Sequence, residues 1–492
     1  MTRRAWYYVV GVFALAVPAV LAITVFPTAM VDLSENYAGG RFFPLTTPEH
    51  PPMQLWVSGV LALIFPPSAL AAIIANQVLN ALTIGYVYAI LRPLIGDSRA
   101  ALTGLLLATC LYIVVGPESY AVGADTLQLP VWTAIVYHLV RAGQTNRWRH
   151  WIGLGVWAAL GIYTKYAIAI LFVALTIASL FVPEYRRQWR NPRFYLAIIL
   201  GLILVSPHLL ALRENSESIA NAEIRLQPVE GILLRLKNLG YVAVSPLFYL
   251  IPGWIIVALG LVAGDFRRDR APPIQPPLRL IQVTCLAGLA ILVAMVLFLG
   301  LTYVPRYDAP FFPLIALAVA PLFTIDEARW PSAEPRVLWS TGLVAAAILV
   351  VGTIAYTVFT SHAYMQEPIA AAEAIMHDDW HKHYACGPGY VLGDRTSAHG
   401  MSMVGERTVG IPVTDVHLVS WFDPKILAAQ GAIVAYRGPI PTDELAAFLP
   451  GLKLSDEKSF TLPLLRTLTK ANLTYHYAFV APAGCPPAPA QN

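Results

Sequence analysis

Long apolar stretches separated by short polar connections make up the first three quarters of the chain. A helix needs about 20 predominantly apolar residues to cross the hydrocarbon core of a bilayer, and about eleven stretches approach that length. The predicted spans lie near residues 5–26, 68–91, 100–116, 127–140, 151–164, 166–182, 194–212, 241–263, 280–300, 310–324 and 337–359. The pattern therefore predicts an α-helical polytopic membrane protein.

Three segments need separate interpretation. The first apolar stretch offers small residues like those of a signal cleavage site, but its length of about 20 residues favours an uncleaved anchor. Residues 53–65 are few for a span and follow a proline pair, so they predict an interfacial helix on the outer surface. Residues 151–182 could form one tilted helix. Basic loops at both ends require an even number of crossings, which predicts two short helices turning near Thr164 and Lys165.

The last quarter has a different pattern. From residue 365 onward Gly, Pro and charged residues return, and short runs such as YVLGD and AIVAY are typical of β-strands. The pattern predicts a transmembrane domain over residues 1–360 and a small α/β domain over residues 361–492. Cys386 and Cys485 fall in this tail and could form a disulfide if the tail is exported.

Charge sorts the connections into two sides. Basic clusters occur near residues 3–4, 92–99, 141–149, 186–193 and 267–279. They fall before the first span and then in every second connection, so they all lie on one side of the membrane. By the positive-inside rule, the N-terminus is cytoplasmic. The opposite side, periplasmic in a bacterium, receives loop 27–67, the connections at 116–126, 213–223 and 302–310, and the C-terminal tail.

Composition agrees with the membrane prediction and excludes one class of partner. The chain is 57% hydrophobic and 13% charged, with a mean hydropathy of +0.60, whereas soluble domains are about 45–50% apolar and about 25% charged. The formal net charge is only +4, and the basic residues occur in short runs between apolar stretches. Nucleic acid is therefore not an expected partner.

Three outer-side carboxylates are candidates for chemistry. Asp32 and Glu35 in VDLSENY are three residues apart, so a helix would place both on one face. The motif alone favours a capping box, in which Asp32 caps a helix and Glu35 reaches back to it. Alternatively, Asp32 is a general base that takes a proton from an attacking hydroxyl. Asp125, in GADTLQLP, either caps the following helix or adds a third carboxylate on this side.

Glu49 and His50 lie in PEHPP, between two apolar stretches. They could simply hold the interfacial helix at headgroup level. Alternatively, His50 contacts a phosphate while Glu49 orients it or shares a divalent metal ion with it.

Three further outer-side residues extend this set. Lys165 ends an apolar stretch, where placing a charge costs free energy. An ionisable residue in such a place is taken first as functional. Arg306 and Tyr307 in VPRYDAPFFP likewise lie beside an apolar stretch and could contact a ligand. Alternatively, Asp308 only neutralises Arg306 in a structural salt bridge. Carboxylates and cations on one side of the membrane suit a reaction that deprotonates a nucleophile while a phosphate departs.

The order of these motifs resembles the lipid-linked-sugar glycosyltransferases of the GT-C class. More closely, it resembles the bacterial protein-mannosyltransferase-like group that includes the aminoarabinose transferase of lipid A and the rhizobial galacturonosyl transferases. HPPMQLW is similar to the HPPL segment of that group, GIYTKYAIAILF to its lysine-bearing turn, and VSPHLLALREN to its segment ending in an aromatic or proline-rich turn. The resemblance covers most of residues 1–325, and the tail matches loosely.

The resemblance implies a role for each candidate. Asp32 is the expected catalytic base, and Glu35 supports it or the acceptor site. The residues expected at the donor phosphate are Glu49, His50, Lys165, Arg306 and Tyr307, with Asp125 at the acceptor or sugar site. His50 replaces a lysine of the aminoarabinose transferase, so its contribution should depend on pH near neutrality. His208 is not a clear match for the histidine that can complete a metal site in the aminoarabinose transferase, so the resemblance leaves open whether a divalent metal ion is bound.

The expected function is an inverting transfer of a sugar from a polyprenyl-phosphate donor to a glycolipid or glycan acceptor of the cell envelope, such as lipid A or lipopolysaccharide core. It would take place on the periplasmic face of a bacterial inner membrane. The alternative is a transporter or flippase of a lipid-linked sugar. Against it, the ionisable residues gather on one side and not at the bilayer midplane, and no internal repeat is evident.

Overall fold

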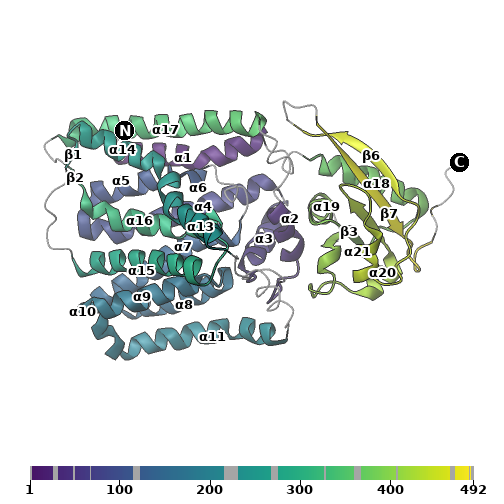
Figure 1. The fold of residues 1–492 in the computed structure, drawn as a ribbon, viewed down its shortest axis with the longest axis horizontal. Helices are drawn as coiled ribbons and strands as arrows, with labels where there is room; N and C mark the ends of the chain where they lie inside the picture. Colours follow the sequence, from purple (N-terminus) through teal and green to yellow (C-terminus); the bar gives the residue numbers. More distant parts are fainter. Residues whose placement is uncertain are drawn as a thin grey trace.

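The computed structural model describes residues 3–25, 31–47, 50–66, 68–114, 122–214, 231–267, 275–325, 329–358, 367–405, 408–465, 471–486 and 488. A helical region occupies one end of the long axis and a sheet domain the other, with α2 and α3 between them (Figure 1). The elements of the helical region are α1 (Arg3–Val25), α2 (Val31–Gly40), α3 (Met53–Ile64), α4 (Ala69–Ile95), α5 (Asp97–Leu107), α6 (Leu111–Val114), α7 (Ala124–Thr145), α8 (Trp148–Thr164), α9 (Ile168–Phe181), α10 (Pro183–Arg186), η2 (Arg187–Arg190), α11 (Pro192–Glu214), α13 (Ile232–Tyr249), α14 (Ile251–Val262), β1 (Phe266–Arg267), α15 (Pro276–Phe298), η3 (Pro305–Asp308), α16 (Phe311–Val319), η4 (Ala320–Leu322), β2 (Thr324–Ile325) and α17 (Trp330–Val358).

Each predicted span overlaps at least one of these helices. Over the described residues, four helices are long and apolar enough to cross a membrane, and two bent pairs could each supply one more span. The four are Ala69–Ile95, Pro192–Arg213, Pro276–Phe298 and Trp330–Ala355. A helical membrane protein is therefore confirmed, while the number of crossings stays a prediction.

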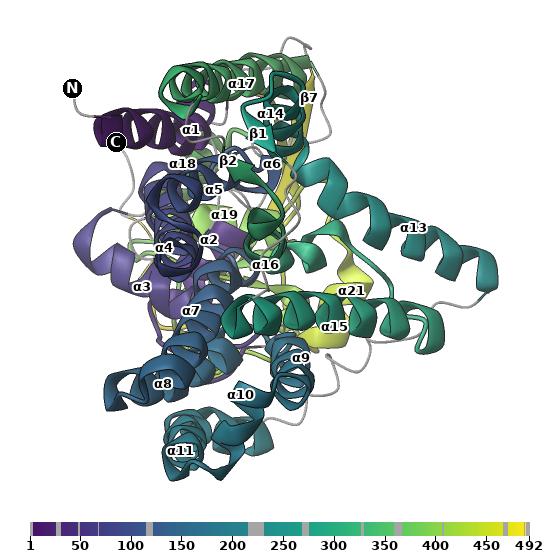
Figure 2. The same ribbon diagram turned by 90° about the vertical axis from the view of Figure 1, so that its left-hand side faces the viewer.

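The helices pack in a layered bundle. In Figure 2, α1 and α17 lie on one side, α8 and α11 on the other, and α4 and α7 between them, in agreement with the packing of α1 on α17, α4 on α7 and α8 on α11. The outer helix α11 exposes Ile199, Leu202 and Ile203. Large apolar side chains on an outer helix suit a surface that faces lipid.

The region 151–182 forms two helices, as predicted. α8 ends at Thr164, Lys165 has extended backbone angles, and α9 begins at Ile168. The α8–α9 turn therefore carries Lys165 at the end of an apolar helix.

α2 and α3 cross at very short range. A Cβ atom added to Gly40 would lie 2.5 Å from the carbonyl oxygen of Leu55, and one added to Gly59 would lie 2.3 Å from the carbonyl oxygen of Gly40. Only glycine permits backbones to approach this closely. The position of α2 is therefore closely fixed against α3.

The C-terminal described residues form an α/β domain. Its elements are α18 (Ile369–His383), β3 (Tyr390–Gly393), α19 (Arg395–Val404), β4 (Val409–Pro412), η6 (Val413–Asp415), α20 (Pro424–Gln430), β5 (Ala432–Tyr436), α21 (Thr442–Phe448), β6 (Lys458–Pro463) and β7 (Asn472–Val480). The sheet order is β4-β3-β5-β7-β6; β3 runs parallel to β4 and β5, and β7 antiparallel to β5 and β6. The runs YVLGD and AIVAY supply β3 and β5, as expected.

Both faces of this sheet are covered. Val434 of β5 packs on the side of α20 and α21, and its neighbour Ile433 packs on the side of α18 and α19. A strand buried on both faces is a continuous apolar run, which explains the sequence AIVAY. A disulfide joins Cys386 and Cys485, 99 residues apart. The predicted boundary at residue 361 lies outside the described residues.

Candidate active site

A cluster of charged side chains joins three segments that are distant in sequence. The Lys165 ammonium lies 2.5 Å from one carboxylate oxygen of Asp125, and the Arg306 Nε lies 3.7 Å from the other. The Tyr307 ring lies 5.2 Å from the Lys165 Nζ, within the range of a cation–π contact. Asp125 is only 7% exposed. The structure thus brings together four of the predicted site residues.

Local structure explains each position in this cluster. Asp125 lies in the first turn of α7, where the helix dipole favours a carboxylate. It is not the cap of that helix, since Gly123 precedes the first turn and the Thr126 hydroxyl accepts a hydrogen bond from the Gly123 N–H at 3.1 Å. Lys165 follows the end of α8, where a cation is favoured. Two cations therefore share one carboxylate where helix ends meet.

Asp308 contacts a different group from the one expected. It is fully buried and accepts a hydrogen bond from the Tyr303 hydroxyl, whereas Arg306 pairs with Asp125. Burial raises the pKa of the Asp308 carboxyl to about 6. The interpretation of Asp308 as only a neutraliser of Arg306 is therefore replaced by a contact within the 301–310 segment.

α2 and α3 are attached to the start of α7 by hydrogen bonds. The Asn36 side chain donates to the Val122 carbonyl at 3.0 Å, and the Ala124 N–H donates to the Gln54 side chain at 2.8 Å. Asp32 is exposed and lies four residues before Asn36, so both lie on one face of α2. The Asn36 bond therefore attaches the helix that carries Asp32 to Val122, just before α7, the helix that carries Asp125.

α2 also contacts the C-terminal domain, through Glu35, which lies one turn from Asp32. Glu35 accepts hydrogen bonds from the Arg395 Nη2 at 2.6 Å and Nε at 3.2 Å. α2 begins at Val31, and Glu35 pairs with Arg395, a contact that the predicted capping box did not include. Arg395 was not a candidate from the sequence.

The segment that leads to α3 is held by its neighbours. The His50 N–H donates to the Thr47 hydroxyl oxygen at 3.1 Å, and that hydroxyl donates to the His50 carbonyl oxygen. The Trp56 ring N–H donates to the Pro44 carbonyl at 2.7 Å. His50 is partly buried, while Glu49 lies outside the described residues.

Aromatic residues near Lys165 make contacts that the sequence did not predict. The buried His208 of α11 lies 2.6 Å from the Leu45 carbonyl through Nδ1 and 3.0 Å from the Tyr166 hydroxyl through Nε2. The ring of Tyr163 packs between Trp56 and His208, at centroid distances of 4.8 and 5.3 Å. The spacing of Tyr163 and Tyr166 around Lys165 was the available signal. These contacts join α11 and the α8–α9 turn to the segment before α3.

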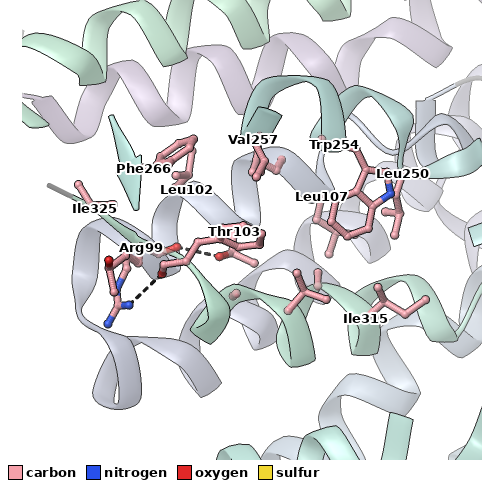
Figure 3. A pocket seen from close by; sticks show the side chains of 17 residues that line it. Arg99, Leu102, Thr103, Leu107, Leu250, Trp254, Val257, Phe266, Ile315 and Ile325 are labelled. Carbon is pink, nitrogen blue, oxygen red and sulfur yellow. Dashed lines mark hydrogen bonds between the residues drawn. The ribbon is translucent and has the colours of Figure 1, made fainter. Parts of the chain in front are cut away.

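Two other features bear on where chemistry takes place. In the described parts of the chain, no three His, Cys, Asp or Glu residues are arranged to hold a metal ion. An apolar pocket of about 90 Å³ lies between α5, α14 and α16, bordered by Leu102, Trp254 and Ile315 (Figure 3). At one end of it, Arg99 donates to the Phe323 carbonyl at 3.0 Å. This pocket contains none of the predicted site residues.

Known proteins resemble both the sequence and the fold. The profile of the dolichyl-phosphate-mannose-protein mannosyltransferase family matches residues 49–210. The solved structure of ArnT from Cupriavidus metallidurans, bound to undecaprenyl phosphate, covers 98% of this chain and 99% of its own, with a TM-score of 0.63 and 16% identity. The fold is that of ArnT. The predicted resemblance to lipid-linked-sugar glycosyltransferases of the GT-C class is confirmed.

Curated relatives resemble part of the chain. The lipopolysaccharide core galacturonosyltransferase RgtA of Rhizobium johnstonii is 24% identical over 282 residues, which are 56% of this chain and 54% of RgtA. The undecaprenyl phosphate-alpha-4-amino-4-deoxy-L-arabinose arabinosyl transferase of Pseudomonas paraeruginosa is 23% identical over 350 residues, 68% of this chain and 60% of that protein. The match thus spans little more than half of each relative. Both are sugar transferases, and neither supports the flippase alternative.

Proposed function

We propose that the protein is an inverting glycosyltransferase that moves a sugar from a polyprenyl-phosphate donor to a glycolipid or glycan of the cell envelope. The observation that carries this proposal is the Asp125–Lys165–Arg306 cluster beside α2, because it puts two cations near a helix that presents an exposed carboxylate. The relatives named for undecaprenyl-phosphate-linked aminoarabinose and for lipopolysaccharide core support the donor and acceptor classes.

The proposed step is a single displacement. The Asp32 carboxylate takes the proton of the acceptor hydroxyl as its oxygen forms a bond to the anomeric carbon. The bond from that carbon to the phosphate oxygen breaks on the opposite face, and its electron pair leaves with polyprenyl phosphate. Lys165 and Arg306 stabilise the departing charge, so no separate general acid is needed. The proton on Asp32 passes to water and restores the base.

The remaining candidates have supporting roles in this proposal. Asp125 holds Lys165 and Arg306 in position and borders the sugar, and Tyr307 contacts Lys165 beside the phosphate. His50 reaches the phosphate from the segment before α3, with Glu49 orienting it or sharing a divalent metal ion with it.

The proposed setting is the inner membrane of a bacterium, with about eleven spans and with the active site and C-terminal domain in the periplasm. A C-terminal reporter active only outside the cytoplasm tests this arrangement. A C-terminus modified by cytoplasmic enzymes would overturn it.

Transfer itself is tested with purified full-length protein, a panel of undecaprenyl-phosphate-linked sugars, and lipid A and core glycolipids as acceptors. Mass spectrometry should show an acceptor heavier by one sugar and free undecaprenyl phosphate, with the anomeric configuration inverted. Asp32→Asn is the matched negative control. Movement of intact donor between leaflets of a vesicle, with no cleavage of its sugar–phosphate bond, would overturn the proposal in favour of a flippase.

A further inference from the structure

α2 lies between the start of α7 and the C-terminal domain, and the contact with that domain is specific. Besides the Glu35–Arg395 pair, the Arg41 guanidinium donates to the Ser402 carbonyl at 3.1 Å. The Phe42 ring stacks on Trp421 with a centroid distance of 5.3 Å and an interplanar angle of 2°. The contact thus combines an ion pair with two hydrogen bonds to one Glu35 oxygen, a further hydrogen bond and an aromatic stack, on one helix and the residues that follow it.

Arg395 approaches Glu35 from a rigid position. It is the first residue of α19, whose N-cap Asp394 accepts hydrogen bonds from the Thr396 and Ser397 N–H groups at 3.1 and 3.2 Å. The guanidinium of Arg437, directly after β5, donates to Asp394 at 3.1 Å. A capped helix start tied to the central strand holds the Arg395 backbone in place.

Glu35 in turn is attached to the helix that presents Asp32. The two carboxylates are one turn apart, and Asn36, next to Glu35, is bonded to Val122 before α7. A force on Glu35 is therefore transmitted to Asp32 through one turn of helix. The Glu35 side chain is 18% exposed and the Arg395 side chain 36% exposed, so the pair is only partly screened by water.

We propose that the C-terminal domain positions the catalytic base. Arg395 of α19 fixes Glu35, and thereby sets where Asp32 stands relative to the Asp125–Lys165–Arg306 cluster. Arg395, in a domain remote in sequence from the cluster, is a positioning residue that acts through Glu35, and neither residue touches substrate. This inference rests on the proposed function, because Asp32 is the base only in that proposal.

A double-mutant cycle tests the coupling on the full-length protein. Arg395→Gln and Glu35→Gln should each lower kcat about 10-fold with the donor KM within about 2-fold, because misplacement of a catalytic group affects the chemical step. The kcat of the double variant should be about that of the less active single variant, since the effects of residues that act as one unit do not add. Lys453→Gln, which removes an exposed cation of the same domain, should match the wild type.

Two kinetic results would overturn the inference. One is an Arg395→Gln variant with wild-type kcat. The other is a double variant whose loss equals the product of the two single losses, about 100-fold, because Glu35 would then act independently of Arg395.

Hydrogen exchange separates this inference from the proposed function. In Arg395→Gln, amides of residues 31–40 should exchange faster, while those of the central strand Ala432–Tyr436 keep their wild-type rates. Unchanged exchange in 31–40 would refute the positioning role, and faster exchange throughout the sheet would replace it with a loss of domain stability. Wild-type protein that transfers no sugar would refute the proposed function while leaving the exchange result interpretable.

Discussion

The first turns of α2 and α7 each carry an aspartate, and the two carboxylates have opposite surroundings. Asp125 is 7% exposed and contacts two cations, whereas Asp32 is exposed on a helix held from both sides. Because the Asp125 carboxylate is paired with Lys165 and Arg306, it can accept a proton only by weakening both ion pairs. In the proposed function, Asp32 of α2 transfers the proton and the cluster at α7 binds the phosphate.

The largest expected effect comes from removing the exposed carboxylate. Asp32→Asn keeps the shape and removes the proton acceptor, so kcat should fall by at least about 100-fold with donor binding largely unchanged. Transfer kinetics and donor-induced thermal stabilisation of the same preparation measure the two quantities. Near-normal turnover would remove Asp32 from the base role. Glu35→Gln should be clearly milder.

Asp125→Asn tests the other side of the contrast. Two cations would lose their shared partner, and breaking a buried pair costs about 3–5 kcal/mol. The melting temperature in detergent should therefore fall together with donor affinity, which Asp32→Asn should leave unchanged. If Asp125→Asn lowered kcat alone, with unchanged melting temperature and donor KM, the two carboxylates would not differ in the way proposed.

Asp308 sharpens the comparison, because it is a buried carboxylate that bonds to a tyrosine. Burial raises its pKa from 3.8 to about 6, so the folded state holds this proton more tightly than the unfolded state does. Its contribution to stability is therefore full below pH 4 and is lost as the pH rises through 6. Asp308→Asn should raise stability at pH 7, by at most about 3 kcal/mol, and flatten the pH dependence. Melting curves between pH 4 and 7 measure this, and equal slopes for both proteins would contradict it.

His50 should give the smallest effect. His50→Ala should raise the donor KM about 3-fold to 10-fold, as for the loss of one charge-assisted contact, and His50→Lys should retain activity with a flatter pH dependence. Donor-concentration kinetics at several pH values distinguish these variants. An unchanged donor dependence in His50→Ala would exclude a contact with the donor.

The positions of the helices and strands could be predicted from the sequence better than the contacts between them. Hydropathy located the helices, and charge parity located the turn at Lys165, because both signals are local in sequence. Alternating and continuous apolar runs likewise located β3 and β5. The family resemblance brought Lys165, Arg306 and Tyr307 into one set before the structure joined them to Asp125.

Contacts between distant segments were not predictable in this way. Nothing near VDLSENY indicates that Glu35 meets Arg395, so its spacing from Asp32 suggested a capping box. His208 was considered only as a histidine that could complete a metal site, and its contacts with Leu45 and Tyr166 depend on the packing of α11. Periodicity describes which face of an element is buried and not which element covers it.

The Glu35–Arg395 contact joins residues that are 360 positions apart. Contacts between such distant residues form late in folding, because they close the longest loops. During synthesis, α2 emerges long before its partner helix exists, and α19 lies within the stretch that the Cys386–Cys485 bond closes. The order of biosynthesis therefore has a consequence for the protein: a chain released before its last domain is complete lacks the Arg395 partner of α2, even when its preceding helices are in place.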